Sequence, residues 1–510
     1  MAPQIHELLT LLSFFLSMIL ALIMVRKNLR KINSIPNIPP GPWKLPIIGN
    51  IPHLVTSMPH RKLRDLAIKY GPLMHLQLGE IFTIVVSSAE CAREVMKTHD
   101  IIFASRPHLL ATDILLYDST DIAFSCYGDY WRHLRKICAT ELLSLRRVKS
   151  LWSIREKEIT TLIKWIASKE ESEINITDAV LSILYTSFSK AAFGKKYEDK
   201  EEFLSAIKQI PKLAGGFYLA DLFPSAKWLQ NISGMRSKLE KMHQRLDRIL
   251  ENIVNDHRDA RSRAKEALVE AKGDLIDVLL NFEDSGTDLD FHLTSNNIKA
   301  IIMDVFVAGT ETIATAINWA IAEMMKHPRV LNKAQVEVRK VFYRRRKVDE
   351  TGIDELKYLK LVIKEALRLH PPAPLLVPRE CREACEINGY NIPVKSRILV
   401  NVWAIGRDPK YWAEPDRFYP ERFIDSSIDY TGNSFEYIPF GAGRRICPGM
   451  NYGMANVEQI LAFLLYHFDW RLPNGMKNED LDLTEEFGGT MKRKCDLYLI
   501  PTITHPLPGI

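Results

Sequence analysis

The 510-residue chain lacks the sequence features that mark several common protein classes. Its seven cysteines are an odd number with no Cys-x-x-Cys spacing, which argues against a disulfide framework and for a reducing compartment. It has no phosphate loop and no G-x-G-x-x-G, so we expect no nicotinamide site of its own. The net charge is only +6 with no long block of like charges, and the basic run at 344–347 is best interpreted as a solvated loop, not a nucleic-acid contact.

Cysteine is nevertheless the most informative residue type, because Cys447 lies in the string PFGAGRRICPG at 439–449. The glycines allow the backbone to turn closely around the sulfur, and Pro448 suits the first position of a helix that the apolar run 457–468 would continue. A thiolate at a helix N-terminus is stabilised by the exposed N–H groups. The string therefore predicts a shielded thiolate ligand for a metal, with a buried structural cysteine as the alternative.

This string resembles the haem-binding signature of the cytochrome P450 monooxygenases, and its flanking prolines resemble the plant microsomal branch, which includes terpenoid oxygenases. The matching residues are Phe440, Gly443, Arg445, Cys447 and Gly449. The resemblance implies a mainly helical fold with a small β-sheet region, in which haem b is buried between a long central helix and the cysteine-bearing loop. It implies that Cys447 is the axial thiolate of the iron. It also implies electrons from NADPH through a separate cytochrome P450 reductase, with cytochrome b5 as a further candidate partner.

The N-terminal residues predict a membrane anchor. Residues 8–25 carry no charge and basic residues follow at 26–31, which by the positive-inside rule keeps the rest of the chain in the cytosol. A cleaved secretory signal is the competing interpretation, but the basic residues lie on the wrong side of the apolar run for one. We expect 1–31 to anchor the chain in the endoplasmic reticulum membrane by a single pass, 32–42 to be a stiff proline-rich hinge, and 43–510 to be one catalytic domain.

An apolar stretch later in the chain predicts a long central helix. Thr294 can cap this helix and Pro328 ends it, which at 1.5 Å per residue gives a length of roughly 50 Å. Asp304 and Glu311 are the charged residues between 300 and 322, and two acids near mid-span make a membrane-crossing helix costly. A core helix that lines a buried site is the better interpretation.

Within this helix, the sequence AGTET at 308–312 resembles the family's oxygen-activation motif. The resemblance implies that Ala308 and Gly309 leave space above the haem, that Thr312 donates a hydrogen bond during oxygen activation, and that Glu311 helps to relay protons. A small residue and a hydroxyl could also let the helix widen and hold a water. The family usually has Thr or Ser next, whereas this chain has Ile313. The alternative is a plain helix with a hydrogen-bonded acid.

Around this core, short β-rich stretches at 82–86 and 387–402 predict the small sheet, and 89–99 predicts a helix. Glu365 and Arg368 are one helical turn apart, and together with Arg422 they resemble the family's Glu-x-x-Arg pair and the arginine that joins it. Their implied role is structural: they hold together the region below the haem.

Several arginines resemble the family's haem-propionate ligands. Trp131 and Arg135 share a helical face by their i, i+4 spacing, and the resemblance implies that both reach a propionate, as do Arg379 and Arg445. Further positive charge at Arg132, Lys136 and Arg444 would attract an acidic reductase.

The loops that line the family's substrate pocket are largely aliphatic here, which suits a lipophilic sesquiterpene or diterpene. The expected function is reductase-dependent hydroxylation of a plant specialised metabolite. The alternatives are oxidation of an alkaloid or phenolic substrate, a haem-thiolate isomerase that needs no external electrons, and a haem-binding scaffold without turnover. The expected pocket residues are Leu109, Leu115, Val305, Ala308, Leu375, Leu376 and Phe487.

Overall fold

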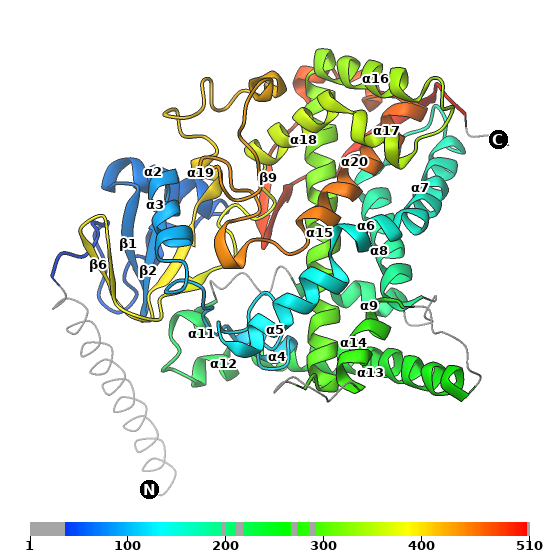
Figure 1. Ribbon diagram of the computed structural model, residues 1–510. Coiled ribbons are helices and arrows are strands. Elements are labelled where there is room, and N and C mark those ends of the chain that lie inside the picture. Colours follow the sequence, from blue (N-terminus) through cyan, green and yellow to red (C-terminus); the bar gives the residue numbers. More distant parts are fainter. Residues whose placement is uncertain are drawn as a thin grey trace, which may run out of the picture.

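The computed structural model describes residues 36–194, 200–207, 209–210, 218–266, 273–284 and 292–506. The anchor predicted at 1–31 lies outside these residues. The described chain is mainly helical with small sheets, as predicted: a large helical body lies beside a smaller region built on a sheet (Figure 1).

A long helix, α15 (Ser295–Lys326), runs through the middle of the helical body (Figure 1). Thr294 caps it as predicted: its hydroxyl accepts from the Asn297 N–H at 3.2 Å, and the Asn297 side chain accepts from the Thr294 N–H at 2.9 Å. Pro328 begins the next helix. In the part of the chain that the structure describes, α15 alone is long and apolar enough to cross a membrane, yet 72% of its most apolar window is buried, as expected of a core helix.

Among the other helices, α8, α18 and α20 pack directly against α15. Their bounds are α2 (Pro59–Tyr70), α3 (Ala89–Arg93), α4 (Leu110–Leu115), α5 (Asp129–Ile137), α6 (Leu145–Ser150), α7 (Trp152–Ala167), α8 (Ile176–Phe193), α9 (Lys200–Ile207), α11 (Leu219–Leu222), α12 (Trp228–Ile232), α13 (Met235–Glu266), α14 (Leu275–Asp284), α16 (Pro328–Phe342), α17 (Glu350–Glu355), α18 (Lys357–Leu369), α19 (Val402–Ile405) and α20 (Met450–His467).

The main sheet has the order β1-β2-β7-β4, with β2 and β7 parallel and the other pairs antiparallel. Its parallel register pairs Thr83 with Arg397 and Val86 with Val400. The strands of the structure are β1 (Leu73–Leu78), β2 (Ile81–Val86), β3 (Ile174–Asn175), β4 (Arg379–Glu380), β5 (Cys385–Ile387), β6 (Tyr390–Ile392), β7 (Arg397–Val400), β8 (Phe468–Arg471), β9 (Glu485–Gly488), β10 (Thr490–Arg493) and β11 (Tyr498–Ile503).

Two local predictions need correction. The helix predicted at 89–99 is α3 followed by a π-helical turn, Glu94–Thr98, whose wider bonding is seen where the His99 N–H donates to the Glu94 carbonyl at 2.8 Å. The helix after Cys447 begins at Met450 with Gly449 as its N-cap, so Pro448 precedes the helix instead of opening it.

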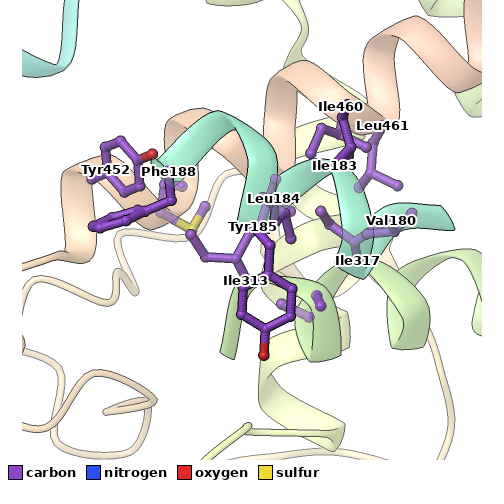
Figure 2. Close-up of a cluster of buried hydrophobic side chains, with 14 of the residues drawn as sticks. Val180, Ile183, Leu184, Tyr185, Phe188, Ile313, Ile317, Tyr452, Ile460 and Leu461 are labelled. Atoms are coloured by element: carbon purple, nitrogen blue, oxygen red, sulfur yellow. The ribbon is translucent and has the colours of Figure 1, made fainter. Parts of the chain in front are cut away.

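The largest hydrophobic core joins α8, α15 and α20. Figure 2 shows side chains from all three helices meeting, among them Val180, Ile317 and Leu461. Large apolar residues at helical spacing on each of the three helices face one another, and their packing fixes the face of α15 that contacts α8 and α20. The other faces of α15 can then form the wall of a site.

Candidate functional site

A cavity lies between the middle of α15 and the segment that carries Cys447. From α15 it is lined by Asp304, Val305, Ala308, Gly309, Thr312, Ile313 and Ala316. The cysteine-bearing segment contributes Pro439, Phe440, Gly441, Arg445, Cys447, Pro448 and Gly449. The two strongest sequence motifs therefore face the same space.

Backbone geometry fixes Cys447 in its segment. Its N–H donates to the Phe440 carbonyl at 3.0 Å. Gly443 adopts φ +68, and a Cβ there would lie 2.2 Å from the Met96 carbonyl oxygen, so no other residue fits without a shift. Burial raises the pKa of the Cys447 thiol, opposed by a hydrogen bond from the Gly449 N–H and by the charge of Arg135. The Gly449 N–H and the charge of Arg135 thus favour the thiolate form that binds a metal, and burial opposes it.

Thr312 and Glu311 face in different directions. Thr312 lines the cavity, and its hydroxyl donates to the Ala308 carbonyl at 2.5 Å, within a regular helix that is not widened. Glu311 is not part of the cavity wall; its Oε1 accepts a hydrogen bond from the hydroxyl of Tyr185 on α8 at 3.1 Å. Figure 2 shows that Tyr185 lies within the core cluster and that its hydroxyl points away from the neighbouring side chains. Burial, followed by the negative charge of Glu311, raises the pKa of Tyr185, which keeps the phenol a donor.

Ile313, the departure from the family pattern, has a packing role. It is 4% exposed and borders both the cavity and the core (Figure 2). Its Cγ1 lies 3.9 Å from where a Cβ of Gly453 on α20 would stand. An aliphatic side chain thus fills the space between α15 and α20 where a hydroxyl would leave a gap.

Positive charge gathers on one side of the cavity. Arg106, Arg135, Arg379 and Arg445 all line it, and Trp131 lies beside them. The Arg445 guanidinium lies 4.1 Å from the centroid of the Trp131 ring and donates to the Ala104 carbonyl at 2.6 Å. Burial lowers the pKa of Arg379 to about 10 and that of Arg445 to about 9. Buried positive charges are costly unless negatively charged groups lie close to them, so this side of the cavity favours an anionic ligand.

Comparison with known proteins identifies this arrangement. The sequence profile of the family described as Cytochrome P450 matches residues 39–498. The chain belongs to the cytochrome P450 family. It is 68% identical to cytochrome P450 71D11 of Lotus japonicus, covering 96% of this chain and 100% of the relative. It is 54% identical to desmethyl-deoxy-podophyllotoxin synthase of Sinopodophyllum hexandrum, covering 97% of each chain, and 52% identical to premnaspirodiene oxygenase of Hyoscyamus muticus, covering 95% and 96%.

A solved structure supports the fold. A zebrafish cytochrome P450 crystallised with abiraterone superimposes with a TM-score of 0.74 at 24% identity, over 88% of this chain and all of that chain. The 510-residue chain is therefore a P450 monooxygenase of the plant type. The P450 family uses haem with a thiolate-bound iron and takes electrons from a redox partner.

The residues of this P450 fit a haem group. Arg135 lines the cavity but has no recorded ion pair or side-chain hydrogen bond with another described residue, so its charge is available for a haem propionate. Gly441 and Gly449 line the wall around Cys447, and a Cβ on Gly449 would stand 4.0 Å from the Cys447 sulfur. A soft thiolate beside an apolar surface, with arginines at one edge, is the donor set that haem requires.

Below this site, Glu365, Arg368 and Arg422 form the buried cluster expected from the sequence. Glu365 and Arg368 both have fully buried side chains and are joined by two hydrogen bonds of 2.8 and 2.9 Å. Arg422 donates to the same carboxylate at 2.9 Å, as does the N–H of Tyr419 at 2.8 Å. These bonds connect α18 to the 413–423 loop, and none of the three side chains lines the cavity.

The predicted pocket residues divide into two groups. Val305, Ala308 and Leu376 line the cavity. Leu376 does so from a turn in which it adopts φ 53, a conformation that is uncommon for a leucine and marks a constrained position.

The other four predicted pocket residues lie elsewhere. Leu115 on α4 packs in the main core, and Leu375 turns to the opposite side from its neighbour, into a separate core with Met74 and Phe223. Phe487 on β9 packs against that same separate core, and Leu109, 1% exposed, is absent from the cavity wall. Sequence position alone did not reveal which way these side chains turn.

A buried pair of acids is the main feature that the sequence did not reveal. Asp304 lines the cavity, and its carboxylate accepts from the Ala123 N–H at 3.0 Å. Asp121, on the loop before α5, accepts from the same N–H at 3.0 Å. Burial raises the pKa of both acids, and their shared bond to the Ala123 N–H holds this loop against α15. Nothing in the spacing of Asp121 and Asp304 signals that they meet.

Proposed function

We propose that this P450 hydroxylates a lipophilic plant specialised metabolite, and that its substrate is a sesquiterpene or diterpene. Residues 1–31 would anchor it in the endoplasmic reticulum membrane, 32–42 would serve as hinge, and 43–510 would form the cytosolic catalytic domain. Electrons would come from NADPH through cytochrome P450 reductase, with cytochrome b5 as a second donor. Arg132, Lys136 and Arg444 are exposed and would meet the acidic reductase.

One observation carries the proposal: Cys447 and Thr312 line one cavity, and away from the arginines and Asp304 the lining residues are largely apolar. An apolar surface of this kind favours a hydrocarbon-rich substrate. The 52% identity to premnaspirodiene oxygenase supports the same substrate class.

The bound haem would supply the chemistry, which is activation of O2 and insertion of one oxygen atom into a C–H bond. Cys447 would bind its iron, and Trp131, Arg135, Arg379, Phe440 and Arg445 would hold its edges. Val305, Ala308 and Leu376 would bind the substrate's apolar surface and exclude water.

Protons would be handled by α15. The Thr312 hydroxyl, now donating to the Ala308 carbonyl, would rotate to donate into the cavity. Glu311 would take protons from the side of α8, where Tyr185 holds its carboxylate, and pass them toward Thr312. Ile313 carries no hydroxyl, so Thr312 would be the donor at this turn.

The test is turnover in microsomes that contain this P450, a plant reductase and NADPH, with terpene hydrocarbons, alkaloids and phenolics offered together. A terpene product heavier by one oxygen, absent without NADPH or reductase, would support the proposal. Turnover that is unchanged without reductase would contradict it and favour an isomerase. Cys447→Ser should abolish the thiolate-type spectrum of the reduced carbon-monoxide complex, and Thr312→Ala should lower product formed per NADPH consumed.

A second substrate class is favoured by one relative. The chain is 54% identical to desmethyl-deoxy-podophyllotoxin synthase, slightly more than to the named terpene oxygenase. Conversion of a phenolic in the same assay, with no terpene product, would keep the reaction and replace the substrate.

A further inference from the structure

Two buried carboxylates with a histidine between them lie behind one wall of the cavity. Glu323 on α15 and Glu485 on β9 are 4% and 2% exposed, and His370, which follows α18, is 6% exposed. His370 Nε2 lies 2.6 Å from Glu323 Oε1, and His370 Nδ1 lies 3.8 Å from Glu485 Oε1. None of these three side chains lines the cavity, so they do not touch a bound ligand.

Each carboxylate also has a basic partner that is partly exposed to solvent. The Nε–H of Arg61, whose side chain is 51% exposed, donates to Glu485 Oε2 at 2.8 Å. Glu323 Oε2 lies 3.3 Å from Nδ1 of His327, whose side chain is 37% exposed. Burial raises the pKa of Glu323, but the neighbouring His327 and His370 outweigh this effect and lower the pKa to about 2. The cluster therefore holds ionised carboxylates inside the protein.

The cluster is connected to the cavity wall through Trp319. The Trp319 ring stacks on His370 with ring centroids 3.8 Å apart and an angle of 1° between the planes. The Trp319 indole N–H donates to the Met491 carbonyl at 2.9 Å, and the Met491 N–H donates to the Pro372 carbonyl at 2.8 Å. Pro372 lines the cavity. Contacts between successive residues thus lead from the buried cluster to the cavity surface.

A second connection starts at Glu485 and passes through Trp403 on α19. The Trp403 indole N–H donates to Glu485 Oε1 at 3.3 Å, and the Trp403 backbone N–H donates to the Pro374 carbonyl at 3.3 Å. The irregular segment 372–377 is therefore held at two points. Within this segment Leu376 adopts φ 53 and lines the cavity. Such a conformation persists only where the surrounding structure holds it in place.

We propose that Glu323, His370 and Glu485 are positioning residues that fix the segment 372–377 and so set the shape of the cavity for a large ligand. A buried charge that loses its partner is costly, so the cluster resists rearrangement and keeps both tryptophans in place. The three residues act on the ligand only through the wall that they hold. The inference rests on the haem site of this P450 and is independent of which substrate the enzyme takes.

Two azoles of different size separate the position of this wall from the state of the haem. Imidazole and N-tritylimidazole both bind haem iron through a ring nitrogen, but the three phenyl rings of the trityl group must also pack against the cavity wall. The Kd of each is measured by spectral titration of the full-length, haem-loaded protein. Neither azole is a substrate, so the result does not depend on the turnover assay.

His370→Phe keeps a ring on Trp319 but removes the bond to Glu323. We expect the Kd of N-tritylimidazole to rise several-fold in this variant, and the Kd of imidazole to stay unchanged. His370→Gln restores a hydrogen-bond donor and should recover part of the lost affinity. Trp319→Phe keeps a stacked ring but loses the bond to the Met491 carbonyl, and should show the same selective loss.

His257 on α13 provides a matched control. It is 8% exposed, its Nε2 lies 3.0 Å from Asp274 Oδ2, and it does not line the cavity. His257→Phe should lower the unfolding midpoint, as His370→Phe does, but leave both Kd values unchanged. The proposal is overturned if N-tritylimidazole binds His370→Phe and Trp319→Phe as tightly as the wild type, or if imidazole loses affinity by the same factor. Trp319→Phe decides the matter where His370→Phe does not retain haem.

Discussion

Replacing Glu365 with glutamine tests how much stability the buried cluster below the site provides. The substitution keeps the size of the side chain but removes its charge, leaving Arg368 without a counter-ion where its own side chain is 0% exposed. Removing one partner of a buried ion pair costs about 3–5 kcal/mol, because the remaining charge stays buried and unpaired. Arg422 donates to the same carboxylate and loses its partner as well. That loss is a large share of the stability of a typical protein, about 5–15 kcal/mol.

The chain contains a matched control for this variant. Glu414 and Arg417 have the same residue types at the same i, i+3 spacing, but their side chains are 66% and 57% exposed. An exposed pair contributes about 0–1 kcal/mol, so Glu414→Gln should be close to neutral. Both variants would be unfolded in denaturant and followed by far-ultraviolet circular dichroism, with haem content measured alongside. Equal unfolding midpoints for Glu365→Gln and Glu414→Gln would refute the reasoning.

Three further changes test other parts of the structure. Tyr185→Phe keeps the ring in the core but removes the donor to Glu311, so product formed per NADPH should fall; in a Glu311→Gln background the same change should have no further effect. Gly309→Val should cost about 1–3 kcal/mol by overpacking, seen as a lower unfolding midpoint, since a Cβ there would stand 2.9 Å from Phe188; an unchanged midpoint would contradict the close packing of α8 on α15. Burial raises the pKa of Glu458 from 4.5 to about 7, so its contribution to stability is present below pH 4.5 and lost as pH rises to about 7. Glu458→Gln should remove this pH dependence, and midpoints that fall equally with pH in both proteins would argue against it.

Much of the site could be predicted because its motifs are local. The turn around Cys447 depends on glycines within a few residues, and the ends of α15 depend on a capping Thr294 and on Pro328. The spacing of Glu365 and Arg368 directly implies a contact on one helical face. In each case the residues that determine the geometry are neighbours in sequence.

The rest required tertiary contacts between distant segments. Glu311 stands next to Thr312 in the AGTET motif, but a tyrosine more than a hundred residues earlier bonds its carboxylate on the side of α8. Leu375 and Leu376 are neighbours in one aliphatic stretch, yet the turn sends them into different surroundings. Side-chain direction in such turns is set by packing partners that no local pattern reveals.

The wall of the cavity consists of both helical and irregular segments of the backbone. One part of the wall is α15, fixed in the largest core, and other parts are irregular segments at 122–123 and 372–377. After gene duplication, substitutions in those segments can alter which molecule is admitted while the oxidising apparatus is inherited intact. This architecture lets a lineage of such enzymes change its products by substitutions in these segments, while the residues that carry the chemistry stay the same.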